Sequence, residues 1–286
     1  MRGWRGVVRH AMAGRTLKPM SFEPGKAVVV TDPAQLATYG RAFRKTGKRV
    51  VLVPLGRGLH AGHISLIRAA KSLLGAIVMV TYNGDDMPED FAREGVDVVF
   101  HGDLSTPVRV VPELDHLEDP DAIAESITRT IAAINATHAT DVVMGEKDFE
   151  ELVALQQAVS ALRMEVLLHS LPTVRAAGGV AMALRNEEVP DSLHDAALAL
   201  SAALTAGAHA AEHGAEVVLE TARGVLDAAG ITPDYLELRS LGFGPAPEVG
   251  DARLLAAATF GPVRLIDNVG VPVGVGFKNM GDEPGA

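Results

Sequence analysis

Short runs of β-branched residues alternate with longer segments of helical period between Lys48 and about Leu171, and this alternation restricts the possible folds more than any other feature of the chain. The runs at residues 49–54 and 76–82 have the length and composition of buried strands. Strands that alternate with helices form βαβ units, and such units build a parallel sheet with helices on its faces. The sequence therefore predicts an α/β fold with a Rossmann-like parallel sheet. Further strands are expected at residues 96–100, 141–144 and 165–171, and helices at 63–74, from Pro120 to about Asn135, and around Leu152 to Leu162.

A second pattern begins after Asn186, where the composition changes. Residues 191–230 are rich in Ala and Leu and predict two helices. Three short runs at 234–240, 253–260 and 263–271 then predict antiparallel strands joined by Gly and Pro. We expect a disordered extension at residues 1–25, the Rossmann-like domain at 26–187, and a smaller C-terminal α+β domain at 188–286.

Charge and composition narrow the choice of partners. The 286-residue chain has a formal net charge of -10, and its acidic residues are spread along the sequence. Such a distribution disfavours binding to nucleic acid or to an anionic membrane, so small molecules are the expected partners. The chain has no Cys, which excludes disulfides, thiolate catalysis and Cys-ligated metal sites. No apolar run reaches the roughly 20 residues that span a bilayer, and we expect a cytoplasmic protein.

The segment VPLGRGLHAGH, residues 53–63, places three glycines and two histidines between a strand and the helix that follows it. Ligands of open parallel sheets bind at the carboxyl ends of strands. Glycines let backbone amides approach a phosphate, a helix N-terminus presents unpaired N–H groups, and His60 and His63 can donate to phosphate oxygens. The segment favours a nucleoside triphosphate site, although a tight turn with capping histidines would use the same residues. A Walker A loop is excluded because its Gly-Lys-Ser/Thr ending is absent.

Two further motifs point to phosphate. Residues 145–148, GEKD, follow another expected strand, so Lys147 would emerge at the same sheet edge as the histidines and could neutralise phosphate charge in a transition state. Arg185 and Asn186 end a segment that begins with PTVR, and Arg185 could clamp a phosphate. A solvated Lys at a helix start and a surface Arg in a hairpin are the structural alternatives.

The motifs and their order resemble the pantoate-beta-alanine ligase (pantothenate synthetase) family of the HIGH-motif nucleotidyltransferase superfamily. The resemblance implies ATP-dependent ligation in two steps: pantoate attacks the α-phosphate of ATP to give pantoyl adenylate and pyrophosphate, and β-alanine then displaces AMP to form pantothenate. It also implies Mg²⁺ held mainly through the phosphates, and a homodimer. The matching segments run from about Val29 to Val269 and are VPLGRGLHAGHISLIRAAKS, VVMGEKDFEELVALQQ, LPTVRAAGGVAMALRN, ALSAALTAGAHAA, DYLELRS and RLLAAATFGPVRLIDN.

Carried over residue by residue, the resemblance implies that His60 and His63 contact ATP phosphates and that Lys147 stabilises the charge that develops on adenylation. No dedicated protein ligands for a metal are expected. The resemblance assigns ATP binding to Gly145, Asp148, Val174, Met182 and Arg185, and the acid-substrate pocket to Leu55, Asn83 and Glu151.

The chain departs from the family at the acid-substrate pocket. Leu55 and Gly56, followed by Arg57, replace the Thr and Met of the family's PTMG motif, and a deletion after Asn83 removes the Gln of the NPxQF motif. Glu151 replaces the second pantoate-binding Gln, and ALRN replaces the SSRN motif. An acidic acceptor beside a carboxylate substrate removes a hydrogen bond and adds like-charge repulsion. We therefore expect weaker binding of pantoate.

Three interpretations follow from this pattern. The chain is a pantothenate synthetase with a remodelled pocket, an adenylating ligase for another small carboxylic acid, such as one with a positive group that Glu151 could pair, or a non-catalytic nucleotide-binding paralogue. Retention of both histidines with Lys147 favours the two enzymes. We expect the remaining histidines in polar or loop contexts to be solvated rather than ligands, namely His10, His101, His116 and His138.

Overall fold

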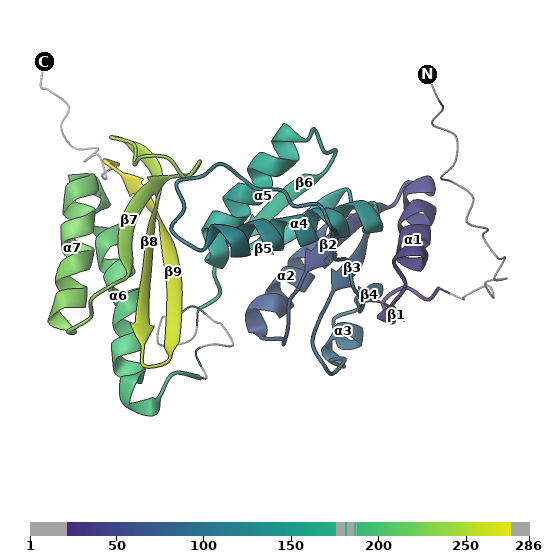
Figure 1. Ribbon diagram of the computed structural model, residues 1–286, viewed down its shortest axis with the longest axis horizontal. Helices are drawn as coiled ribbons and strands as arrows, with labels where there is room; N and C mark the ends of the chain where they lie inside the picture. Colours follow the sequence, from purple (N-terminus) through teal and green to yellow (C-terminus); the bar gives the residue numbers. More distant parts are fainter. Residues whose placement is uncertain (1–21, 176–180, 182–185, 187, 276–286) are drawn as a thin grey trace, which may run out of the picture.

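The computed structural model describes residues 22–175, 181, 186 and 188–275. They form two sheets that lie side by side along the long axis of the molecule, each with its own helices (Figure 1). The chain enters the larger sheet first and ends in the smaller one. The α/β fold class predicted from the sequence is confirmed.

The larger sheet has six parallel strands in the order β1-β4-β3-β2-β5-β6. From β2 the chain moves outward through β3 to β4 and then returns to the other side of β2 as β5. The switch point of this doubly wound sheet therefore lies between β2 and β5, where ligands bind in such folds. The strands are β1 (Val28–Val30), β2 (Arg49–Pro54), β3 (Ala76–Thr81), β4 (Val98–Phe100), β5 (Asp141–Gly145) and β6 (Leu167–Leu171).

Helices cover both faces of this sheet, which explains why β2 is an unbroken apolar run rather than an alternating one. Val51 and Val53 pack with α2 and α3, whereas Leu52 packs with α4 and α5. The predicted helix start at Pro120 is confirmed, because Asp119 caps α4 by accepting from the Asp121 N–H at 2.9 Å. The helices are α1 (Pro33–Lys45), α2 (Ala61–Ser72), α3 (Asp90–Arg93), α4 (Pro120–Thr137) and α5 (Phe149–Ala161).

The smaller sheet is antiparallel, in the order β7-β8-β9, and two helices cover one of its faces. The two helices and three strands predicted for this part of the chain are confirmed. Two single 3-10 turns, η3 (Asp191–Leu193) and η4 (Ala211–His213), flank the first helix. The main elements are α6 (His194–His209), α7 (Ala215–Ala228), β7 (Tyr235–Ser240), β8 (Gly250–Phe260) and β9 (Val263–Val273).

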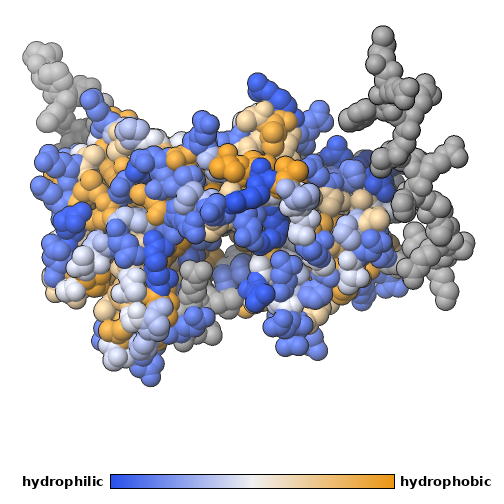
Figure 2. Space-filling view, in the orientation of Figure 1, coloured by the Kyte–Doolittle hydropathy of each residue, from blue (hydrophilic) through white to orange (hydrophobic). Residues whose placement is uncertain are grey.

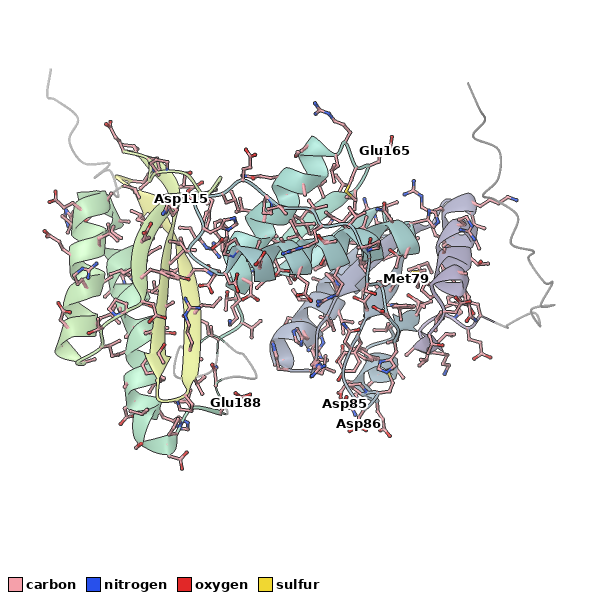
Figure 3. All side chains as sticks on the ribbon, viewed as in Figure 1. Met79, Asp85, Asp86, Asp115, Glu165 and Glu188 are labelled. Carbon is pink, nitrogen blue, oxygen red and sulfur yellow. The ribbon has the colours of Figure 1, made fainter. Side chains whose placement is uncertain are left out.

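Residues 101–119, here called the connecting segment, run from the end of β4 to the start of α4 and touch both sheets. Figure 3 shows Asp115 of this segment beside the small sheet, where it pairs with Arg239 at 2.7 Å. Glu118 accepts from Arg264 at 2.7 Å and from the Tyr235 hydroxyl at 2.8 Å. The segment therefore ties the two sheets together through charged side chains.

The same segment is also held on the Rossmann-like side. Glu150 of α5 is buried and accepts from the backbone N–H groups of Leu117 at 3.1 Å and Glu118 at 3.0 Å. The Nδ1 of His116 lies 2.6 Å from the Glu150 carboxylate. The expectation that His116 is solvated is therefore wrong, because α5 supplies a buried carboxylate that no local pattern reveals.

Among the residues that the structure describes, no helix is long and apolar enough to cross a membrane. On the face seen in Figure 2, apolar residues form separate patches among hydrophilic ones. The corner between α5 and β6 includes the exposed Leu162 and Leu167.

Candidate active site

A cavity of about 910 Å³ opens at the carboxyl ends of β2 and β5, at the switch point of the parallel sheet. Such a volume lies at the upper end of the usual range for small-molecule sites. Segments that are far apart in the sequence line it, among them the turn after β2, the turn after β5, and residues 171–174 at the end of β6. His60, His63 and Lys147 thus lie at one cavity, as expected for residues that follow the carboxyl ends of neighbouring parallel strands.

His60 caps the helix that follows β2. Its backbone is extended, and its Nδ1 accepts a hydrogen bond from the Gly62 N–H at 3.1 Å. Because Nδ1 accepts, the neutral imidazole carries its proton on Nε2. A Cβ at position 62 would lie 2.8 Å from the His60 ring, so glycine at this position leaves room for the capping geometry.

The two histidine rings stack with their centroids 3.8 Å apart. Burial, with a smaller contribution from the neighbouring His60, lowers the pKa of His63 to about 4. The pKa of His60 is also lowered, by burial first and then by Lys147. At neutral pH both rings are therefore uncharged N–H donors rather than cations.

Two buried polar atoms at the cavity have no hydrogen-bond partner within the described part of the chain, His63 Nδ1 and Thr173 Oγ1. Buried polar groups are nearly always paired in folded proteins, and an exception signals a missing partner. Both residues line the cavity, although the two atoms themselves are buried in its wall.

Lys147 lies on a single 3-10 turn, η1 (Glu146–Asp148), between β5 and α5. Its Nζ is 3.7 Å from the Asp148 carboxylate, and its side chain is 24% exposed. Gly145 and Asp148 line the cavity beside it. The ammonium group can thus reach an anion in the cavity without leaving a buried partner behind.

The small sheet fixes this turn. Asn268 of β9 is buried, and its Nδ2 donates to the carbonyl oxygens of Glu146 at 3.0 Å and Lys147 at 2.7 Å. Arg253 of β8 donates to the Asn268 Oδ1 at 2.6 Å and to the Glu146 carboxylate at 2.7 Å. We call Asn268, Arg253 and Glu146 the Asn268 clamp. Its bonds hold the backbone on which the Lys147 side chain is carried.

Strand β9 also holds the segment that follows β6. Arg175 donates to both carboxylate oxygens of Asp267, at 2.7 and 3.0 Å, and to the Asn268 carbonyl at 3.0 Å. Val174, the residue before it, lines the cavity. Met182 and Arg185, which were expected to bind ATP, lie outside the described residues.

Leu55, Asn83 and Glu151, the three residues expected in the acid-substrate pocket, also line the cavity, and the part of the wall that they form is here called the acid end. Leu55 is buried, Asn83 donates its backbone N–H to the Gly56 carbonyl at 3.2 Å, and Glu151 projects from α5. Their roles in binding remain predictions. The loop after Asn83 is short and exposed, and Figure 3 shows Asp85 and Asp86 at its outer edge.

The surroundings of Glu151 do not favour the ionised form that a glutamate side chain normally takes at neutral pH. Burial, with a smaller contribution from the nearby Asp148, raises the pKa of Glu151 to about 7. The Ser126 hydroxyl donates to Glu151 Oε1 at 2.7 Å. The like-charge repulsion expected from the sequence is therefore diminished near neutral pH, because the Glu151 carboxyl group is protonated in a large fraction of the molecules.

Several residues that line this end were not predicted. Ser126, Arg129 and Thr130 come from the middle of α4, and His101 and Asp103 follow the end of β4. The expectation that His101 is solvated is wrong, because its Nδ1 lies 3.1 Å from the Tyr82 carbonyl at the cavity wall. The rule that predicted the turns after β2 and β5 applies equally to the end of β4 and could have found His101 and Asp103.

Replacing His60 tests its two tasks separately. We expect His60→Asn to keep the helix cap, because Asn is a favoured N-cap residue, but to raise the KM for ATP by about tenfold through loss of the Nε2–H donor. His60→Ala should raise the same KM and also cost about 1 kcal/mol of unfolding free energy. Thermal melts and ATP saturation curves check both. Equal ATP KM values for wild type and His60→Asn would contradict a phosphate contact.

Comparison with known proteins points to the same family as the motifs that line the cavity. A family model described as pantoate-beta-alanine ligase matches residues 28–92 and 86–270, two stretches that overlap at residues 86–92. A pantothenate synthetase from Corynebacterium jeikeium is 42% identical, over 92% of this chain and 96% of that one. Another from Mycobacterium avium is 39% identical, over 88% and 92%.

Solved structures share the fold. Pantothenate synthetase from Thermus thermophilus has a TM-score of 0.70 at 23% identity, covering 85% of this chain and 98% of that one. Pantoate-beta-alanine ligase from Francisella tularensis, complexed with beta-gamma ATP and beta-alanine, has a TM-score of 0.66 at 21% identity, covering 85% and 97%. With the match of the family model over most of the sequence, the chain belongs to the pantoate-beta-alanine ligase family.

Proposed function

We propose that this chain joins pantoate and β-alanine to form pantothenate, using ATP and releasing AMP and pyrophosphate. The observation that carries the proposal is the convergence of His60, His63 and Lys147 on one cavity large enough for a nucleotide and a small acid. In the first step a pantoate carboxylate oxygen bonds to the α-phosphorus of ATP and pyrophosphate leaves. In the second, the amine of β-alanine bonds to the acyl carbon, AMP leaves, and the amine gives up a proton.

The two ends of the cavity divide the work. His60 and His63 donate to phosphate oxygens, and Lys147 stabilises the negative charge that builds up on the α-phosphate as the new bond forms. Gly145, Asp148 and Val174 line the nucleotide end, and the family resemblance assigns ATP binding to Met182 and Arg185 as well. Leu55, Asn83 and Glu151 line the acid end.

Mg²⁺ fits this donor set as a partner of the nucleotide. Within the described ranges no three His, Asp or Glu side chains are close enough to hold a metal ion. Mg²⁺ commonly retains several waters and binds through substrate phosphates with only one or two carboxylates. Asp148, half-exposed beside Lys147, is the carboxylate at the phosphate end that could contribute. When bound, the ion would neutralise phosphate charge.

The organisation of the chain is also proposed here. A boundary near residue 188 separates the Rossmann-like ATP-binding domain from the C-terminal α+β domain. The family resemblance supports a homodimer in the cytoplasm, with small-molecule substrates and neither nucleic acid nor membrane as a partner.

ATP–pyrophosphate exchange tests the function. We expect labelled pyrophosphate to enter ATP only when pantoate is present, and pantothenate and AMP to appear in equal amounts when β-alanine is added. A panel of other small carboxylic acids provides the control. Exchange with another acid and none with pantoate would show that the cavity, with its polar side chains from α4, binds a different acid. ATP binding without exchange for any acid would indicate a non-catalytic paralogue.

A further inference from the structure

Glu151 is a carboxyl side chain in a cavity that is proposed to bind a carboxylate, and its surroundings explain how both can be accommodated. The side chain lies between α4 and α5 and faces the acid end of the cavity. Oε1 is occupied by the Ser126 hydroxyl at 2.7 Å. Oε2 makes no hydrogen bond within the described part of the chain, so this oxygen remains available to a ligand.

The groups around Glu151 act on its pKa in opposite directions, and the effects that raise it are the larger ones. Asp148, three residues earlier at the end of η1, is a like charge. Arg129 of α4 also lines the cavity and, although it is paired with Glu125, it lowers the pKa of Glu151, as does the hydrogen bond from Ser126. Burial adds to the effect of Asp148, and together they hold the pKa of Glu151 at about 7. A carboxyl group in this setting carries a proton through much of the physiological range.

We propose that Glu151 is itself protonated when it binds the acid substrate. Its Oε2–H donates a hydrogen bond to an oxygen of that substrate, while the Ser126 hydroxyl donates to Oε1. A protonated carboxyl group has one donor and retains acceptor capacity, so it offers the same hydrogen-bonding pattern as a primary amide at that point. Specificity for an anion is thus achieved by an acidic residue. The identity of the acid as pantoate rests on the proposed function, but the protonated state of Glu151 does not.

Loss of the proton reverses the interaction. Above pH 7 the ionised Oε2 can only accept, and it repels a carboxylate substrate. If only the neutral form binds, the apparent KM for the acid rises in inverse proportion to the neutral fraction. With the pKa of Glu151 at about 7, we expect about a tenfold rise in the KM for pantoate from pH 6 to pH 8.

The matched variant is Glu151→Gln, which keeps size and donor but cannot ionise. We expect its KM for pantoate to be flat from pH 6 to pH 8 and below that of the wild type at pH 8. Ser126→Ala removes the hydroxyl that favours the ionised form, so its KM should begin to rise at a higher pH than in the wild type. The KM for ATP, measured over the same range, reports on the histidine end and should not follow this curve.

An infrared measurement makes the result independent of turnover. The wild type minus Glu151→Gln difference spectrum should contain the carbonyl band of a protonated carboxyl group, and this band should disappear as the pH rises through about 7. A flat wild-type KM, or an identical rise in Glu151→Gln, overturns the proposal. Absence of the infrared band at pH 6 overturns it even if pantoate is not the substrate, whereas a titrating band without turnover on pantoate would reject the proposed function alone.

Discussion

Replacing Lys147 by alanine is expected to lower kcat for ATP–pyrophosphate exchange by about 10³-fold, the largest effect of any single side chain in the cavity. The reason is electrostatic. His60 and His63 are neutral at physiological pH, so they supply hydrogen bonds but no positive charge. Lys147 is carried on a turn held by the Asn268 clamp and therefore presents a fixed charge where the phosphate becomes more negative. Steady-state exchange rates with saturating ATP and acid measure the loss.

The matched control is Arg57→Ala, which removes a cation from the same cavity. Arg57 is exposed, so its charge is not held in place, and we expect a loss of less than about tenfold. Circular dichroism melts of both variants should stay close to the wild type, because Lys147 loses only its 3.7 Å contact with Asp148. A Lys147→Ala variant with kcat within tenfold of the wild type would refute its role in charge stabilisation.

The second large effect is expected far from the phosphates, at Asn268. In Asn268→Asp the side chain keeps its size and its acceptor for Arg253, but an oxygen replaces the amide that donates to the Glu146 and Lys147 carbonyls. The ionised aspartate would repel both carbonyls and shift the turn. Because displacement of a catalytic group by about 1 Å can cost about 10²-fold, we expect a loss of that order in kcat and a much smaller change in the KM for ATP.

A stability control separates positioning from unfolding. Leu265→Ala, in the same strand but in the apolar core of the small sheet, should cost about 2–5 kcal/mol of unfolding free energy. Measured well below its melting temperature, this variant should keep kcat within about twofold of the wild type. If Asn268→Asp lowered the melting temperature yet kept its kcat, the clamp would be structural only.

The fold was predictable where packing follows a simple period. Residues 49–54 form an apolar run because both faces of β2 are covered, and the α4 cap is local to Asp119 and Asp121. Helix α1 was not predicted, although Leu36, Tyr39 and Phe43 pack in the core, and its contact with α4 at Gly40 has no apolar side chain to reveal it. A Cβ at Gly40 would lie 2.0 Å from the Thr137 carbonyl, so the two helices meet backbone to backbone. Strand β1 and helix α3 are too short to show a period.

The site was predictable where function lies at the ends of strands. The turns after β2 and β5 each combine a strand end with glycine, so His60 and Lys147 could be placed at one edge from sequence. Ser126 and Arg129 come from the middle of a helix, and only the position of α4 over the sheet brings them to the cavity. The identity of Glu151 is visible in the sequence, but its pKa depends on burial between α4 and α5, which is a property of the folded chain.

The Asn268 clamp also determines the order in which parts of the site can form while the chain is being synthesised. Lys147 and the side chain that fixes its carbonyl are separated by 121 positions along the chain. A ribosome that has released the whole parallel sheet has therefore still not supplied β9, and until β9 emerges the lysine turn lacks both of its Nδ2 hydrogen bonds. A nascent or truncated chain can thus fold its nucleotide half before that half is fully competent, so efficient adenylation waits for β9.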